Sequence, residues 1–127
     1  MQTIAQLTLL VREYDEAVDF YVNKLGFEKR EDSPQGDGKR RIVVAPSGSG
    51  CALVLAKATT AEQMGRVGAQ SGERVFLYLH TDDIHRDFEK LRQNGVSILR
   101  EPTTADFGIA LVFEDVYGNK WDLVQPA

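Results

Sequence analysis

The chain is poor in several features, and each shortage excludes a class of protein. It has a single cysteine, Cys51, so no internal disulfide can form, which favours a reducing cytoplasm. No His lies near Cys51 in the sequence, so we expect a small buried or half-buried residue there and not a nucleophile. No stretch approaches the roughly 20 apolar residues of a membrane span. The N-terminus also lacks the basic lead of a secretion signal, so we expect a cytoplasmic protein without a membrane partner.

Positive charge is also scarce. The 15 Lys and Arg residues are outnumbered by 19 Asp and Glu residues, which gives a net charge of −4. Proteins that bind nucleic acid usually carry a basic stripe, and the only basic run here, Lys39–Arg41, is interpreted as the flank of a turn. Nucleic acid is therefore not an expected partner. The 127 residues, 43% of them hydrophobic, suffice for one domain with a real core.

The first half of the chain reads as strand, helix and three strands. Side chains alternate in character over residues 3–11, which predicts a strand. Residues 15–25 have helical spacing, and their apolar stripe consists of Val18, Tyr21, Val22 and Leu25. Gly26 is placed to end this helix. Short strands are predicted over residues 27–32, 41–45 and 51–57, separated by turns at 34–38 and 47–50.

The second half repeats this order. A strand is predicted over residues 74–81, and Asp83 can cap a helix over 84–94 that Gly95 ends. Its inner face is formed by Ile84, Phe88 and Leu91. Strands are then predicted over residues 96–100, 109–115 and 120–125, with a connection at 101–107 and a turn at 118–119. An order that recurs in this way indicates an internal structural repeat.

The repeat sets the predicted domain organisation. We expect one domain of residues 1–127, with module one at about 1–58, a connector at 59–73 and module two at 74–127. Thr60 and Gln63 have the spacing of a capping box, which predicts one short helix in the connector. Aligning the modules gives the first helix one extra residue, Leu25, and places Leu53 on Asp122.

Two kinds of side chain alternate along the strands. Val75, Leu77 and Leu79 are aliphatic and suit a face covered by a helix, whereas Phe76, Tyr78 and His80 alternate with them. The mixed face can be solvated, as in many antiparallel sheets, or it can be a subunit interface. It can also line a cleft for a small molecule, since such sites are apolar with a few polar groups. The apolar size of Phe76, Tyr78 and Leu53 favours the cleft.

Three segments carry a resemblance to a known family: "LLVREYDEAVDFYVNKLGFE", "LHTDDIHRDFEKLRQNGV" and "FEDVYGNKWDLVQP". With the two modules, they resemble the glyoxalase, bleomycin-resistance and extradiol-dioxygenase superfamily, which has the vicinal oxygen chelate (VOC) fold. The resemblance implies an α+β fold of two βαβββ modules that form curved mixed sheets with helices on the outer face. It also implies a homodimer. It does not imply one activity, because the fold hosts lyases, isomerases, dioxygenases and drug-binding proteins.

The resemblance also bears on metal binding. Members that use a metal place ligands at four strand positions, which fall here on Gln6, Leu53, Phe76 and Asp122. Leu and Phe cannot bind a metal ion, and Gln and Asp alone would hold one poorly. His80 shares the predicted face of Phe76 but lies roughly 13 Å further along the strand, at about 3.3 Å per residue. We therefore expect no metal site and no cofactor.

The sequence thus favours a small-molecule-binding member of the superfamily without a catalytic metal. The predicted ligand-binding residues are Gln6, Thr8, Leu53, Phe76, Tyr78, His80 and Asp122. The alternative is a metal-dependent glyoxalase-like lyase or isomerase, or a ring-cleaving dioxygenase. The sequence leaves open whether the protein is an enzyme, and the candidates for acid–base chemistry are Asp122, His80 and Tyr78.

Overall fold

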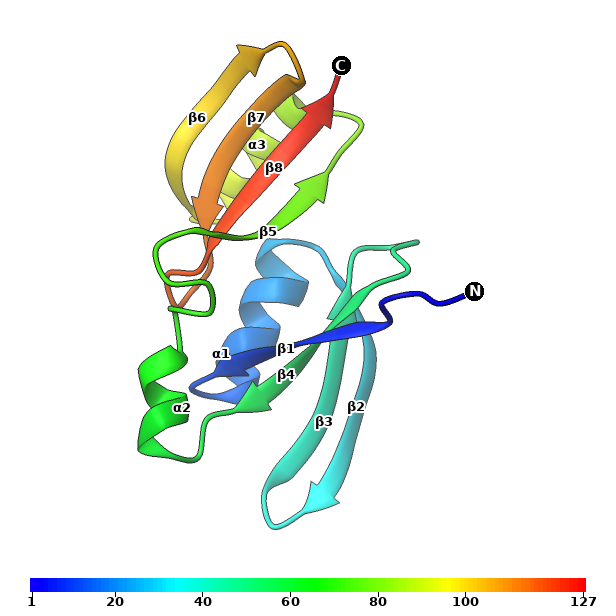
Figure 1. Ribbon diagram of the computed structural model, residues 1–127. Helices are drawn as coiled ribbons and strands as arrows, with labels where there is room; N and C mark the ends of the chain where they lie inside the picture. Colours follow the sequence, from blue (N-terminus) through cyan, green and yellow to red (C-terminus); the bar gives the residue numbers. More distant parts are fainter. The chain divides into compact units, whose positions relative to one another are not determined.

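The computed structural model describes all 127 residues, which divide into two compact units, Met1–Val67 and Gly68–Ala127. Each unit contains one four-stranded mixed sheet (Figure 1). The boundary falls inside the predicted connector at residues 59–73. The predicted α+β fold class with two βαβββ modules is confirmed.

Unit one is built around the sheet β1-β4-β3-β2. Its elements are β1 (Gln6–Val11), α1 (Tyr14–Val18), the π-helix η1 (Asp19–Lys24), β2 (Glu28–Gly36), β3 (Lys39–Ala45), β4 (Ala52–Lys57) and α2 (Ala61–Arg66). β1 pairs with β4 in parallel, whereas β2–β3 and β3–β4 are antiparallel. One face of this sheet is core, and its fully buried side chains on β1 and β3 include Leu9, Val11, Ile42 and Val44.

Unit two repeats this arrangement with the sheet β5-β8-β7-β6. Its elements are β5 (Val75–His80), α3 (Ile84–Gln93), β6 (Ser97–Ala105), β7 (Gly108–Glu114) and β8 (Lys120–Pro126). The indole of Trp121 stacks on the ring of Phe113 with centroids 5.9 Å apart. Ile84 and Leu91 of α3 are buried, as are Leu111 and Leu123 of the sheet. This apolar core covers one face of the sheet and leaves the opposite face for other side chains.

The first helix differs from the continuous helix predicted over residues 15–25. After α1 the chain widens into η1, where the Leu25 N–H donates to the Phe20 carbonyl five residues earlier, at 3.0 Å. The buried residues are Ala17, Phe20 and Tyr21, whereas Val18, Val22 and Leu25 of the predicted stripe are only half-buried. A π-turn accommodates one additional residue, which accounts for the extra residue in the first helix of the repeat.

The predicted helix caps are present. Thr60 accepts a hydrogen bond from the Gln63 N–H at 3.1 Å, and the Gln63 side chain accepts one from the Thr59 N–H at 2.8 Å. Asp83 accepts from the Arg86 N–H at 3.1 Å and begins α3. No helix of the chain is long and apolar enough to cross a membrane.

β6 is longer than predicted. The sequence predicts a strand over residues 96–100, but the strand continues to Ala105 through the segment predicted as a connection. Its pairing with β7 shifts register between Ile98 and Arg100 and again before Thr103. Pro102 is compatible with this strand because β6 lies at the edge of the sheet and is irregular there.

Candidate functional site

The open face of the unit-two sheet carries a row of side chains that crosses all four strands. Residues paired in register point to the same face, and one such row consists of Tyr78, Asp122, Val112 and Arg100. The next row consists of His80, Val124, Ala110 and Thr103. Trp121 and Leu123 lie on the other, covered face. Strand alternation thus places Asp122 opposite the core.

A cavity of about 400 Å³ opens on this face. It is lined by Tyr78, His80, Phe107, Asp122, Val124 and Pro126. Tyr78 is 68% exposed and Phe107 is 59% exposed, so two aromatic side chains stand in solvent beside it. A smaller recess of about 130 Å³ shares Phe107 and Asp122 and includes Arg100 and Thr103.

Two residues of this face were missed in the sequence. Phe107 lies in the segment predicted as a connection, so no strand pattern pointed to it. Arg100 lies at the end of a predicted strand, but its face depends on the register shifts on both sides of it in β6. Neither residue carried a local signal that could have placed it at the site.

Asp122 is the polar centre of this face. Its Oδ1 atom is buried and accepts no hydrogen bond. Burial raises the pKa of Asp122 above its ordinary value, and the positive charge of Arg100 acts in the opposite direction. A buried acceptor without a donor is costly, so Asp122 Oδ1 is an acceptor at this cavity whose hydrogen-bonding capacity is unused.

Tyr78 and His80 do not form a catalytic dyad with Asp122 in this structure. Tyr78 is the register neighbour of Asp122, while His80 is paired with Val124. No hydrogen bond joins Asp122 to either side chain. Both residues are exposed at the cavity wall, where they can contact a ligand.

Phe76 is separated from this cavity by an irregularity in β5. The pairing with β8 shifts between Val75 and Leu77, which interrupts the regular alternation of side chains. The Phe76 ring is half-buried and meets the Trp121 ring edge-on, with centroids 6.1 Å apart. Phe76 is not among the residues that line the cavity.

The corresponding face of unit one carries Gln6 and Thr8, both exposed. Leu53 does not share it: Leu53 pairs with Leu7 and is only 4% exposed, whereas Thr8 pairs with Val54. Its predicted placement beside Gln6 is wrong because the repeat alignment was one residue out of register, and such a slip exchanges the faces of a strand. Val54 therefore occupies the position on β4 that Leu53 was expected to fill.

The chain matches a known protein family over nearly its whole length. The family model of the Glyoxalase/Bleomycin resistance protein/Dioxygenase superfamily matches residues 3–123. The chain belongs to this superfamily, and the resemblance inferred from its sequence is confirmed.

Particular relatives share nearly its full length. An uncharacterized protein of Shewanella frigidimarina (strain NCIMB 400) is 49% identical over 126 residues, which is 98% of this chain and 93% of the relative. The crystal structure of UcmS2 is 30% identical, with a TM-score of 0.85 and 98% of each chain covered. TnmS3, described as an antibiotic binding protein from Streptomyces sp. CB03234, is 30% identical with a TM-score of 0.81, over 100% of this chain and 98% of TnmS3.

The side chains present do not fit the metal that many members of this superfamily use. Within neither unit do three or more His, Cys, Asp or Glu side chains gather in a group that could hold a metal ion. Gln6 uses its side-chain oxygen to accept a hydrogen bond from Arg41 Nη2 at 3.0 Å. Asp122 has only apolar and aromatic neighbours on its own row besides Arg100. This donor set supports no chemical step through a metal ion.

Proposed function

We propose that the protein binds a small molecule on the open face of unit two and does so without a catalytic metal. The observation that carries this proposal is the buried, unpaired Oδ1 of Asp122 on a face that is otherwise largely apolar. A ligand that donates a hydrogen bond to this atom would relieve the penalty of an unsatisfied buried acceptor.

The lining of the cavity supports a ligand with apolar surface. A volume of about 400 Å³ suits a small organic molecule. Tyr78 and Phe107 supply aromatic walls, and Val124 and Pro126 supply aliphatic contact. His80 can donate or accept a hydrogen bond at the edge. We also propose that Gln6 and Thr8 contact ligand on the open face of unit one.

The relatives support binding as the activity. TnmS3 is described as binding an antibiotic, and it shares the fold and 30% of its residues with this chain over nearly the whole of both. A sheet that presents one carboxyl among aromatic and aliphatic side chains suits retention of a ligand, because it offers few groups for covalent chemistry.

A binding screen on the full chain tests the proposal. Aromatic small molecules that carry an amine, amide or hydroxyl group would be titrated and followed by amide chemical shifts and calorimetry. We expect binders that shift the amides of residues 78, 107 and 124 and that weaken about tenfold in Asp122→Asn. Asp37→Asn, the same change at an exposed turn, is the matched control and should bind normally. A screen without any binder at this face would refute the proposal.

Metal analysis tests the proposal that the protein binds its ligand without a catalytic metal. The protein would be purified without chelator and its metal content measured by mass spectrometry. We expect trace amounts only, because the donor set of each unit is incomplete. Near-stoichiometric Zn, Ni, Mn or Fe would contradict a metal-free site.

One observation favours an enzyme as the competing function. A cavity carboxyl with a raised pKa, as at Asp122, is a common property of acid–base catalysts. Turnover of a hemithioacetal or a catechol that is lost in Asp122→Asn or His80→Ala would establish a lyase, isomerase or dioxygenase. Unchanged turnover in both variants would exclude these residues from the chemistry.

We further propose that both units belong to one domain that works as a homodimer in the cytoplasm. Leu99 is 47% exposed on β6, an outer strand of its sheet, and such strands can pair with another chain. This apolar side chain supports association of two copies.

A further inference from the structure

Unit one has a recess of its own, which shares only Thr8 with the contacts proposed above. Its volume is about 360 Å³. The floor comes from β1 and β4, where the register pairs Thr8 with Val54 and Leu10 with Ala56. Polar side chains at its walls are Tyr14, Gln35, Thr59 and Gln63.

The charged residues that line this recess are all cationic: Lys39, Arg40, Arg41 and Lys57. No carboxylate lines it, although the chain as a whole has a net charge of −4. The acidic partners of these cations, Glu13, Asp15, Glu31 and Asp32, lie outside the lining. The charged groups that the recess presents to a bound molecule are therefore all positive.

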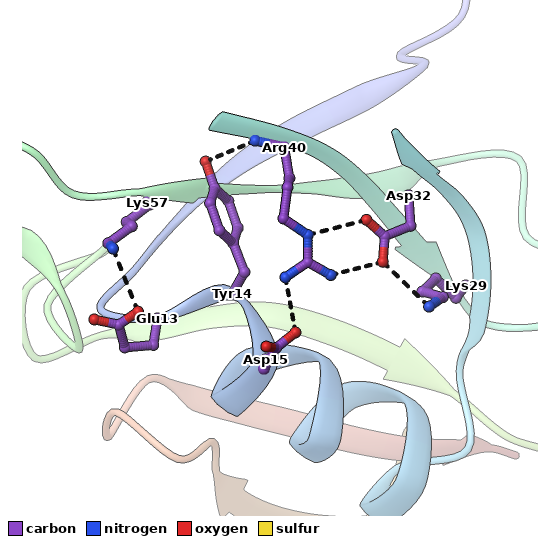
Figure 2. Close-up of polar contacts among 7 residues, drawn as sticks. All are labelled: Glu13, Tyr14, Asp15, Lys29, Asp32, Arg40 and Lys57. Atoms are coloured by element: carbon purple, nitrogen blue, oxygen red, sulfur yellow. Dashed lines mark hydrogen bonds and ion pairs between the residues drawn. The ribbon is translucent and has the colours of Figure 1, made fainter. Parts of the chain in front are cut away.

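Arg40 has a structural task in this group. Figure 2 shows its guanidinium between two carboxylates. Nε and Nη2 donate to Asp32 at 3.1 and 2.7 Å, and Nη1 donates to Asp15 at 2.7 Å. The backbone N–H of Arg40 also donates to the Tyr14 hydroxyl at 3.3 Å. Because two carboxylates neutralise its charge, Arg40 forms part of the wall of the recess but would attract an anion only weakly. The other cations of the recess are therefore the groups that can attract an anion.

The remaining three cations are less fully paired. Lys39 is exposed and has no ion pair. Arg41 donates from Nε to Glu31 at 3.3 Å, but its Nη2 bonds the neutral amide of Gln6. Lys57 lies 3.3 Å from Glu13, in a pair whose side chains are 40% and 61% exposed. Exposed pairs of this kind are weak, so these three cations can interact with another anion.

We propose that this recess binds an amphipathic anion: a small molecule with a carboxylate, sulfonate or phosphate head and an apolar body. The head lies among Lys39, Arg41 and Lys57, where charge-assisted hydrogen bonds form. The apolar body lies on the floor of Thr8, Leu10, Val54 and Ala56. This recess belongs to unit one and the Asp122 face to unit two, and the recess differs from that face in selecting for a negative charge.

Three probes with one apolar body and different heads test this assignment. They are 2-naphthoate, its neutral alcohol 2-naphthylmethanol and the cation 2-naphthylmethylammonium, each titrated into the ¹⁵N-labelled full chain at neutral pH. We expect naphthoate to shift the amides of residues 8, 54 and 59 and to bind more tightly than the alcohol. The cation should bind least. Equal binding of all three, or preference for the cation, would overturn the proposal.

Single substitutions identify the groups that recognise the anion. Lys39→Gln and Arg41→Gln are each expected to weaken naphthoate about three- to tenfold and to leave the alcohol unchanged, as removal of a partly exposed charge partner does. Lys90→Gln removes an unpaired exposed lysine from α3 in the other unit and is the matched control. Unchanged naphthoate affinity in both recess variants, with native amide spectra, would overturn the assignment.

Two further measurements distinguish anion binding in unit one from the binding proposed at the Asp122 face of unit two. Raising the salt concentration should weaken naphthoate and leave the alcohol unaffected, because exposed charges are screened. Asp122→Asn should leave naphthoate binding at residues 8, 54 and 59 unchanged. Naphthoate shifts confined to residues 78, 107 and 124 would overturn the anion site in unit one, while small-molecule binding by unit two would stand.

Discussion

At the scale of single residues, Asp122 is an acidic side chain in the middle of a strand and has no hydrogen-bond donor for one of its oxygens. The residues before and after it, Trp121 and Leu123, are 3% and 2% exposed and form core. These two buried side chains therefore stabilise the strand. Asp122, on the opposite face, lowers the stability of the fold because its Oδ1 is a buried acceptor without a donor. A costly polar group that folding does not require is a reasonable mark of a binding site.

The effect of Asp122 on the stability of the fold depends on pH. The folded-state pKa of Asp122 is raised above the ordinary 3.8. At a pH between 3.8 and the folded-state pKa, the folded chain therefore binds a proton that the unfolded chain lacks. The contribution of Asp122 to stability therefore falls as pH rises through that window. Asp122→Asn removes the titration, and we expect it to be more stable than wild type at pH 7 by about 1 kcal/mol.

Urea unfolding at about pH 7 and below about pH 4 checks this. The difference between Asp122→Asn and wild type should shrink at the lower pH, where both side chains are neutral. An Asp122→Asn protein that is less stable at pH 7 would show that the carboxylate is satisfied in the folded chain.

Gly68 is a second residue whose identity is dictated by its surroundings. Its φ is +79°, and a Cβ there would lie 2.0 Å from the Tyr117 carbonyl oxygen. The turn that holds Tyr117 is fixed by Asp115, whose Oδ1 accepts hydrogen bonds from the N–H groups of Tyr117 and Asn119 at 2.9 Å. Neither this backbone oxygen nor the turn can move easily.

We therefore predict that Gly68→Ala destabilises the chain by about 3 kcal/mol, through the positive φ and the clash together. Gly72→Ala is the matched control, because Gly72 has a φ of +68° and nothing within 4 Å of an added Cβ. It should cost only about 1 kcal/mol. Denaturant unfolding measures both, and equal losses would show that the clash is relieved by movement.

At the scale of elements, Arg40 connects three parts of unit one. It extends from β3, pairs with Asp32 on β2 and with Asp15 at the beginning of α1 (Figure 2). Its guanidinium also lies 5.5 Å from the centre of the Tyr14 ring. Arg40 therefore fixes the start of the helix against the β2–β3 hairpin.

We predict that Arg40→Gln lowers the urea midpoint at neutral pH more than Arg92→Gln does. Arg92 pairs with Glu89 within α3 and is 59% exposed, whereas the Arg40 side chain is 30% exposed. Arg40 lowers the pKa of Asp32 below 3.8, so the stability from this pair is present above that value and is lost as pH falls through the lower pKa.

The difference between wild type and Arg40→Gln should therefore narrow in acid, which unfolding curves over a pH series would show. A difference that persists unchanged in acid would mean that Arg40 acts through packing on Tyr14 and not through Asp32.

Local sequence patterns predicted the helix caps correctly but missed features of two elements, η1 and β6. The helix caps at Thr60 and Asp83 were predicted correctly because a cap depends on residues within one turn. The π-turn after α1 was not predicted, since helical spacing alone does not report which carbonyl the Leu25 N–H will reach. β6 was predicted too short because Pro102 indicates a loop unless the strand lies at an edge.

At the scale of the whole molecule, the proposed homodimer is testable by mass. Sedimentation should give about twice the chain mass of 14.2 kDa. Leu99→Glu should shift the protein toward monomer, because it places a charge on the exposed outer strand. Val116→Glu, at a residue 41% exposed in a turn, is the control. A wild-type monomer at high protein concentration would contradict the proposal.

The candidate site was only partly predictable. Alternation along β5 and β8 was enough to group Tyr78, His80 and Asp122 on one face, since the period of a strand is a local property. Leu53 was misplaced because its face depends on its register in β4 against β1. Phe76 lies beside a bulge and outside the lining of the cavity, which the sequence did not indicate. Arg100 and Phe107 join the site from β6 and the turn after it.

The sequence alone determined the repeat of two modules, the helix ends and the family, because periodicity, caps and turn residues act over a few positions. Only the tertiary structure decided which residue lies beside which on neighbouring strands. That pairing leaves Asp122 Oδ1 without a donor and lines the recess of unit one with four cations. Both depend on contacts between residues far apart in the chain, which no local pattern specifies.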